Sequence, residues 1–252
     1  MLNDTDSSYL LKELFDSALH PPTFETVSDV TVEVILPEIR SYSEYLKSTF
    51  LKEGAYHPYP DRKSIIEEKL NKEKMSLEGN TNLDALISGS DVDGKDKFIF
   101  IEAKYLADVS KDTTYNTVRD QIIRNIDAAI YFMRETNDEK NPRVDDFWFY
   151  LLTPGIFRTK SFGGPTTNPL KVYRPEKSRL YCYKMEEYLE WRNIRDVLPH
   201  QHLKDEEWET IANHIGWFTF EEMMVVSKKY SLIPDAAEKQ MIYDFFAARF
   251  MI

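Results

Sequence analysis

The chain has 252 residues, of which 42% are hydrophobic and 30% are charged, a composition typical of a soluble globular protein with one sizeable core. No apolar run approaches the roughly 18 residues that a membrane span needs, and the single cysteine, Cys182, excludes an internal disulfide, so we expect a cytoplasmic protein. The formal net charge of −11 excludes a surface that is basic throughout, as a general nucleic-acid binder would need.

Three elements are predicted in the first fifth of the chain. Ser8 to Leu19 has the pattern of a short helix that ends before two prolines. Val27 to Leu36 is rich in β-branched residues and is predicted to be a strand. Glu38 to Leu51 has apolar residues at helical spacing, which predicts a second helix.

The centre of the chain predicts a hairpin, a helix and a further strand. Asn82 to Ser88 and Lys97 to Lys104 read as two strands joined by the turn-forming residues Gly89 to Gly94. Thr117 to Arg134 is strongly amphipathic, and Asp146 to Thr153 is an apolar strand. Because a helix between strands returns the chain across a sheet, this order predicts an α/β core with a mixed central sheet flanked by helices.

The C-terminal part of the chain is predicted to be helical. Residues 205–252 carry apolar side chains at helical spacing, and Thr219 followed by Glu222 has the pattern of a capping box at a helix start. We therefore expect a helical extension that packs on a main domain formed by residues 1–204.

Three charged residues mark the ends of the two central strands. Asp84 lies in the first strand, and Glu102 and Lys104 close the second strand directly after an apolar run. Because side chains in a strand alternate with a period of two, Glu102 and Lys104 point to the same face. If the two strands pair through the intervening turn, Asp84 and Glu102 approach each other beside Lys104.

Two neighbouring carboxylates repel each other, and a hard divalent cation is the simplest way to neutralise them. Mg²⁺ prefers oxygen ligands and keeps several waters, which leaves positions for a phosphate, and Mn²⁺ is expected to substitute for it. Such an ion stabilises charge that develops on a phosphoryl group, while Lys104 can orient the attacking water. The pattern therefore predicts phosphodiester hydrolysis; the alternative is an exposed strand end with a surface ion pair.

Asp84, Glu102 and Lys104, followed in order by the amphipathic helix and the apolar strand, form a pattern that resembles the PD-(D/E)xK, or restriction-endonuclease-like, nuclease superfamily. The resemblance covers a catalytic core of about residues 80–153, with Leu83 in the place of the proline in the superfamily's name. It implies a restriction-endonuclease-like fold with helical N- and C-terminal additions.

The resemblance also implies an activity. It implies a Mg²⁺-dependent endonuclease acting on double-stranded DNA, with Asp84 and Glu102 as metal ligands and Lys104 as the catalytic lysine. A restriction-type or other defence enzyme is the expected setting, and a repair or recombination nuclease is the neighbouring interpretation. Cutting both strands needs two such sites, which suggests a homodimer. Two rivals are a catalytically silent nuclease-like binding module and a structural subunit whose helical C-terminus docks on a partner.

Further polar residues are candidates for the same site. Members of the superfamily often carry an acidic residue on a helix before the first catalytic strand, and Glu44 is our choice as a third metal ligand, with Glu67, Glu68 and Glu78 as competitors. On the long helix we assign Gln121 to the catalytic group, and Arg124 and Asn125 to contacts with nucleic acid. The alternative for all three is an ordinary helix edge.

A basic segment follows the last central strand. Between residues 158 and 184, only Glu176 opposes the basic side chains of Arg158, Lys160, Lys171, Arg174, Lys177, Arg179 and Lys184. Aromatic residues lie among them, a mixture that can contact phosphates and stack on bases. We expect Arg158, Lys160, Lys171 and Arg174 to bind DNA; a solvated charged loop is the alternative. His200 and His202 have no third ligand at suitable spacing, and we expect them to be structural.

Overall fold

A computed structural model describes residues 13–16, 18, 20–37, 39–50, 64, 67–68, 80–105, 119–136, 143–159, 190–229, 236–238, 240–241 and 244. Within these stretches, no helix is long and apolar enough to cross a bilayer.

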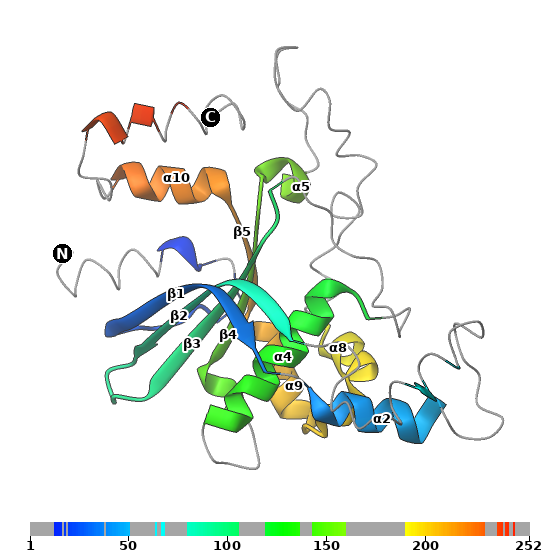
Figure 1. Ribbon diagram of the computed structural model, residues 1–252. Coiled ribbons are helices and arrows are strands. Elements are labelled where there is room, and N and C mark those ends of the chain that lie inside the picture. The colour runs from blue at the N-terminus through cyan, green and yellow to red at the C-terminus, as the bar shows by residue number, and fades with distance from the viewer. Residues whose placement is uncertain are drawn as a thin grey trace.

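A five-stranded mixed sheet forms the centre of the molecule, with the strands in chain order across it (Figure 1). The strands are β1 (Thr26–Leu36), β2 (Thr81–Ser90), β3 (Asp96–Ala103), β4 (Phe147–Thr153) and β5 (Ile215–Thr219). The first three strands pair antiparallel, whereas β4 pairs parallel with both β3 and β5. The parallel half therefore brings the C-terminal ends of β3, β4 and β5 to one edge of the sheet.

Helices cover the sheet, and short helices join the strands (Figure 1). The longer ones are α2 (Arg40–Phe50), α4 (Gln121–Thr136), α9 (Asp205–Asn213) and α10 (Phe220–Lys229). The shorter ones are α5 (Gly155–Thr159), α8 (Trp191–Val197), and the 3₁₀ turns η2 (Val144–Asp146) and η5 (Pro199–Gln201). Along the chain, helix α4 connects β3 to β4 and crosses one face of the sheet, as the connection between two parallel strands requires.

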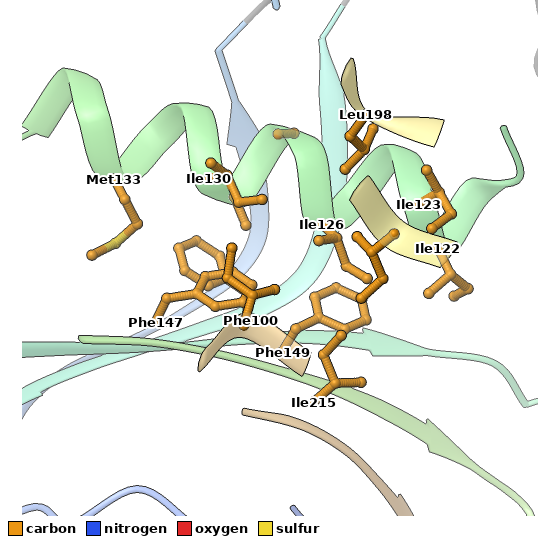
Figure 2. Packing of buried hydrophobic residues seen from close by; sticks show 14 of the residues in the cluster. Phe100, Ile122, Ile123, Ile126, Ile130, Met133, Phe147, Phe149, Leu198 and Ile215 are labelled. Carbon is orange, nitrogen blue, oxygen red and sulfur yellow. The ribbon is translucent and has the colours of Figure 1, made fainter. Parts of the chain in front are cut away.

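The larger core lies between α4 and one face of the sheet. Figure 2 shows the apolar stripe of α4, which includes Ile126 and Ile130, above Phe100 of β3 and Phe149 of β4. The opposite face of the sheet has its own apolar cluster, in which Ile99 is fully buried. Alternate residues of β3 are thus buried on both faces, which explains why its sequence is continuously apolar.

The predicted α/β class and mixed sheet are confirmed, while the start of one helix and the content of the C-terminal segment differ from the prediction. Helix α4 begins at Gln121 rather than at Thr117, because Asp120 caps it: its carboxylate accepts a hydrogen bond of 2.9 Å from the amide of Ile123. The segment 205–252, which we predicted to be helical, also contributes the fifth strand of the sheet, β5. The five residues of β5 are all buried and show no alternation, so their pattern does not distinguish a strand from a helix.

Candidate functional site

The two predicted carboxylates meet where β2 and β3 separate. Pairing between these strands ends at Ala85 opposite Ile101, and the next residues in the same register are Asp84 and Glu102. Beyond this point the amide of Ala103 donates a hydrogen bond of 2.7 Å to Oδ2 of Asp84, in place of a backbone carbonyl. The structure therefore brings Asp84 and Glu102 together at the end of the ladder, as the sequence predicted.

Glu102 is held by three side-chain donors. Its Oε1 accepts hydrogen bonds from Nζ of Lys104 at 2.6 Å and from Nε2 of Gln121 at 2.8 Å. Its Oε2 accepts a hydrogen bond of 2.7 Å from Nδ2 of Asn125. The residue is 2% exposed, so both carboxylate oxygens are fixed inside the protein rather than hydrated. Such a fully oriented carboxylate is pre-organised to act as a ligand.

The pKa of Glu102 is raised above its ordinary value. Burial is the main cause, and the negative charge of Asp84 adds to it. The ammonium group of Lys104 and the amide of Asn125 act in the opposite direction without cancelling the effect. Burial therefore disfavours the ionised form of Glu102, and a cation bound beside it would favour that form.

Asp84 connects the site to solvent, and Lys104 gives it a positive charge. Asp84 is exposed, so its carboxylate meets solvent beside the buried Glu102. The side chain of Lys104 is 12% exposed, and its backbone amide donates a hydrogen bond of 2.8 Å to the carbonyl of Leu152 in β4. Lys104 is thus anchored at the edge of the sheet where β3 and β4 end, the edge at which open α/β sheets bind their ligands.

These residues suit a magnesium ion with few protein ligands. Two carboxylates supply hard oxygen donors, and Mg²⁺ commonly binds through one or two carboxylates and keeps its remaining waters. Within the described part of the chain, no group of three or more His, Cys, Asp or Glu side chains is placed to hold a metal. Among the described residues, Asp84 and Glu102 therefore define the candidate metal position.

The three polar residues predicted on α4 have different partners. Gln121 and Asn125 both bind Glu102, so the side chain of Asn125 faces the carboxylate rather than a nucleic-acid surface. Arg124 donates a hydrogen bond of 2.9 Å from Nη2 to the carbonyl of Asn80, directly before β2. The start of α4 therefore contacts both β3 and the chain leading into β2, the strands that carry the two carboxylates.

The remaining predicted residues are Glu44, Arg158 and three basic residues that lie outside the described part of the chain. Glu44 is exposed on α2, on the side of the helix opposite the buried Tyr42. Arg158 of α5 makes an ion pair of 2.6 Å with Glu222 and donates a hydrogen bond of 3.0 Å to the carbonyl of Trp217. The predicted DNA-binding residues Lys160, Lys171 and Arg174 lie outside the described residues.

One acidic residue near the site escaped the sequence analysis. The pairing of Val32 with Ala85 and of Val34 with Leu83 places Glu33 opposite Asp84 on the neighbouring strand. Glu33 has a φ of 53°, a conformation uncommon for residues other than glycine. The sequence did not indicate that Glu33 lies near the site, because a single acidic residue in a β-branched strand forms no pattern and only the strand register identifies its neighbour.

Comparisons of the chain with protein-family models, with curated proteins and with solved structures found no match. Any functional interpretation therefore depends on the geometry of Asp84, Glu102 and Lys104 and on the fold that carries them.

Proposed function

We propose that the protein is a Mg²⁺-dependent endonuclease that hydrolyses phosphodiester bonds of DNA, built on a restriction-endonuclease-like core. The observation that carries the proposal is the group of Asp84, Glu102 and Lys104 at the end of β3, where a buried carboxylate with a raised pKa adjoins an exposed one. The sheet supports it, since an antiparallel hairpin followed by a helix and a parallel strand is the order that the resemblance implies.

The metal would be held by the two carboxylates. Glu102 is fixed in place by Gln121 and Asn125, whereas Asp84 reaches solvent and can receive a hydrated ion. A bound Mg²⁺ would supply a Lewis acid that stabilises negative charge on the phosphoryl oxygens, and Mn²⁺ would substitute for it.

The chain's own contribution to the reaction comes mainly from Lys104. Its ammonium group lies 2.6 Å from Oε1 of Glu102, so it is a compact positive charge beside the proposed metal position. From there it can orient a water molecule and stabilise the charge of the transition state. The oxygen of that water forms a bond to phosphorus while one ester P–O bond breaks, which leaves a phosphate monoester on one product and a hydroxyl group on the other.

The proposed substrate is double-stranded DNA, bound locally by a protein that is acidic overall. With a net charge of −11, most of the surface repels a polyanion, so binding would depend on the basic segment that begins at Arg158. A homodimer would place two sites on the two strands. A restriction-type or other defence role in the cytoplasm is the setting that we propose for this activity.

The direct test is a cleavage assay on supercoiled and linear DNA. Wild type, Lys104→Ala and Asp84→Asn would be incubated with Mg²⁺, with Mn²⁺ or with EDTA. We expect metal-dependent cleavage by the wild type and strongly reduced cleavage by either variant, and discrete fragments would indicate sequence recognition. If the wild-type protein is folded and the DNA stays intact with every metal, the result would contradict the proposed activity.

A catalytically silent nuclease-like module is the second candidate, and one observation favours it. Both oxygens of Glu102 already accept hydrogen bonds, and an ammonium group already lies where a metal would neutralise the carboxylate. In this case the protein would bind nucleic acid or a protein partner and would not cleave. Gel-shift and size-exclusion measurements with DNA on the same preparation distinguish a silent binder from an inactive preparation.

A further inference from the structure

A second group of buried polar residues lies on the far side of α4 from Glu102. Arg119 and Asp127 are both fully buried, and His200 and Gln201 of η5 are 4% and 1% exposed. The proposed reaction uses none of them. Charged side chains are rarely buried so completely unless they are paired, so their position calls for a structural reason.

Asp127 is the centre of this group. Its Oδ2 accepts a hydrogen bond of 2.5 Å from Nη1 of Arg119, and Nε2 of His200 lies 3.0 Å from both of its oxygens. Gln201 also donates to Oδ1 of Asp127. The Arg119 guanidinium, with the hydrogen bonds from His200 and Gln201, outweighs the effect of burial and holds the pKa of Asp127 well below its ordinary value. We call Arg119, Asp127, His200 and Gln201 the Asp127 network.

The Asp127 network attaches the first half of α4 to two other elements. Arg119 lies two residues before the helix, and its side chain reaches Asp127 in the second turn of the helix. Its guanidinium carbon lies 4.0 Å from the centre of the ring of Tyr42 in α2. His200 adds the attachment to η5. The start of α4 is therefore also held by polar contacts on the flank of its apolar stripe that lies opposite to Asn125.

The same two turns of α4 carry both sets of contacts. Asn125, which binds Glu102, and Asp127 are two residues apart, which places them about 200° apart around the helix axis. A rotation or shift of α4 that breaks one set therefore moves the other. The apolar stripe beneath α4 does not fix this rotation closely, because hydrophobic contact is non-directional whereas hydrogen bonds fix angle and distance.

We propose that Arg119, Asp127 and His200 are positioning residues for the site at Glu102. They hold α4 in the rotation that places the side-chain amides of Gln121 and Asn125 on that carboxylate. Only the expected effect on metal binding rests on the proposed function. The effect on the hydrogen bond between Asn125 and Glu102 does not depend on it.

The test follows the side-chain NH₂ group of Asn125 by ¹⁵N–¹H NMR on the full-length protein. Its resonance is assigned by its loss in Asn125→Ser. In the wild type we expect a hydrogen-bonded, exchange-protected signal. In Asp127→Asn, which keeps the shape of the side chain and removes its charge, we expect this signal to lose its protection and to shift. An unchanged Asn125 signal in a folded Asp127→Asn protein would overturn the proposal.

A matched control separates positioning from general loss of stability. Asp146→Asn makes the same change in a buried carboxylate that pairs with Lys97 at the opposite end of β3. We expect Asp146→Asn to lower the melting temperature and to leave the Asn125 signal in place. If Asp146→Asn moves that signal as much as Asp127→Asn does, α4 is held by overall stability and the proposal is wrong.

A second variant covers the case in which Asp127→Asn does not fold. Replacing Arg119, Asp127 and His200 together by Met, Leu and Leu removes the buried ion pair and the imidazole bound to it as a set, a change that proteins often tolerate without loss of stability. We expect this triple variant to fold and to lose the protected Asn125 signal. A folded triple variant with the wild-type signal would overturn the proposal.

Metal binding adds a readout that links the network to the site. Changes to groups that orient a metal ligand typically weaken metal binding by 10- to 100-fold. We expect the affinity for Mn²⁺, measured by calorimetry, to fall by about tenfold in Asp127→Asn and to be unchanged in Asp146→Asn. If the wild type binds no Mn²⁺, the proposed function fails, while the Asn125 signal still decides whether the network positions α4.

Discussion

Strand β3 carries a buried ion pair at each end, and the two pairs are balanced differently. At its start, Nζ of Lys97 lies 2.5 Å from Asp146 and 3.2 Å from Asp91, and Arg143 pairs with the second oxygen of Asp146. Burial by itself lowers the pKa of Lys97, but the two carboxylates outweigh it and raise that pKa above its ordinary value. The charged form of Lys97 is therefore favoured at this end of the strand.

At the other end of β3 the balance is reversed. One ammonium group, that of Lys104, faces the buried Glu102 with Asp84 close by, and burial prevails, so the pKa of Glu102 is raised. The charged form of Lys97 is thus favoured at the first pair, whereas the charged form of Glu102 is disfavoured at the second. Buried charges alone therefore do not indicate function. The candidate site is the pair whose buried carboxylate would be stabilised by a further cation.

Removal of Lys104 is expected to have the largest effect. Lys104→Ala should lower the rate of DNA cleavage by roughly 10²- to 10³-fold, because the charge that stabilises the transition state is lost. The affinity for Mn²⁺ should not fall, since Lys104 competes with the metal for Glu102. Cleavage rates and calorimetry on the same variant check both expectations. Weaker Mn²⁺ binding in Lys104→Ala would show that the lysine helps to assemble the metal site.

A change at the first pair should affect stability and leave activity intact. Asp146→Asn should lower the free energy of unfolding by about 3 kcal/mol, the low end of the range for a broken buried pair, because Asp91 still pairs with Lys97. Urea denaturation measures this loss, and cleavage by the folded variant should match the wild type. A parallel loss of cleavage would mean that the two ends of β3 are not independent.

The raised pKa of Glu102 sets the pH dependence of metal binding. Only the ionised carboxylate binds a metal, so Mn²⁺ affinity should rise as the pH rises through the raised pKa of Glu102. On acidification the binding should be lost while the pH is still above 4.5, the ordinary pKa of glutamate. Because the ammonium of Lys104 lowers this pKa, the midpoint should lie at higher pH in Lys104→Met. Calorimetric titrations across pH test this; a midpoint unchanged in Lys104→Met would contradict the charge balance.

The smallest expected effect is that of Asp84 on its neighbour. Asp84 raises the pKa of Glu102 through its negative charge, so Asp84→Asn should lower that pKa toward its ordinary value. By linkage, the fold of the variant should lose less stability than the wild type as the pH rises through this range. The ¹³Cδ signal of Glu102 followed against pH reports the shift. An upward shift in Asp84→Asn would reverse the sign of the interaction.

The sequence predicted those parts of the molecule that repeat a local pattern. The alternation in β3 indicated that Glu102 and Lys104 share a face, and the apolar stripe of α4 indicated a helix that crosses the sheet. Asp84 was predicted beside Glu102 because a short turn joins their strands. Each of these inferences needed only neighbouring residues and the geometry of one regular element.

The remaining features depend on contacts that no local pattern records. Asn125 lies on the border of the apolar stripe, and only the packed rotation of α4 shows that its amide binds Glu102. The pairing of Arg158 with Glu222 joins residues 64 positions apart. The position of Glu33 opposite Asp84 needs the register of β1, and β5 is too short for its pattern to identify it.

Metal binding at Asp84 and Glu102 is the most direct test of this account. Mn²⁺ would be titrated into the wild type, Asp84→Asn and Asp146→Asn at neutral pH and followed by calorimetry. We expect a Mn²⁺ site in the wild type that is lost in Asp84→Asn and retained in Asp146→Asn. Absence of binding in the wild type, or binding that survives Asp84→Asn, would contradict it.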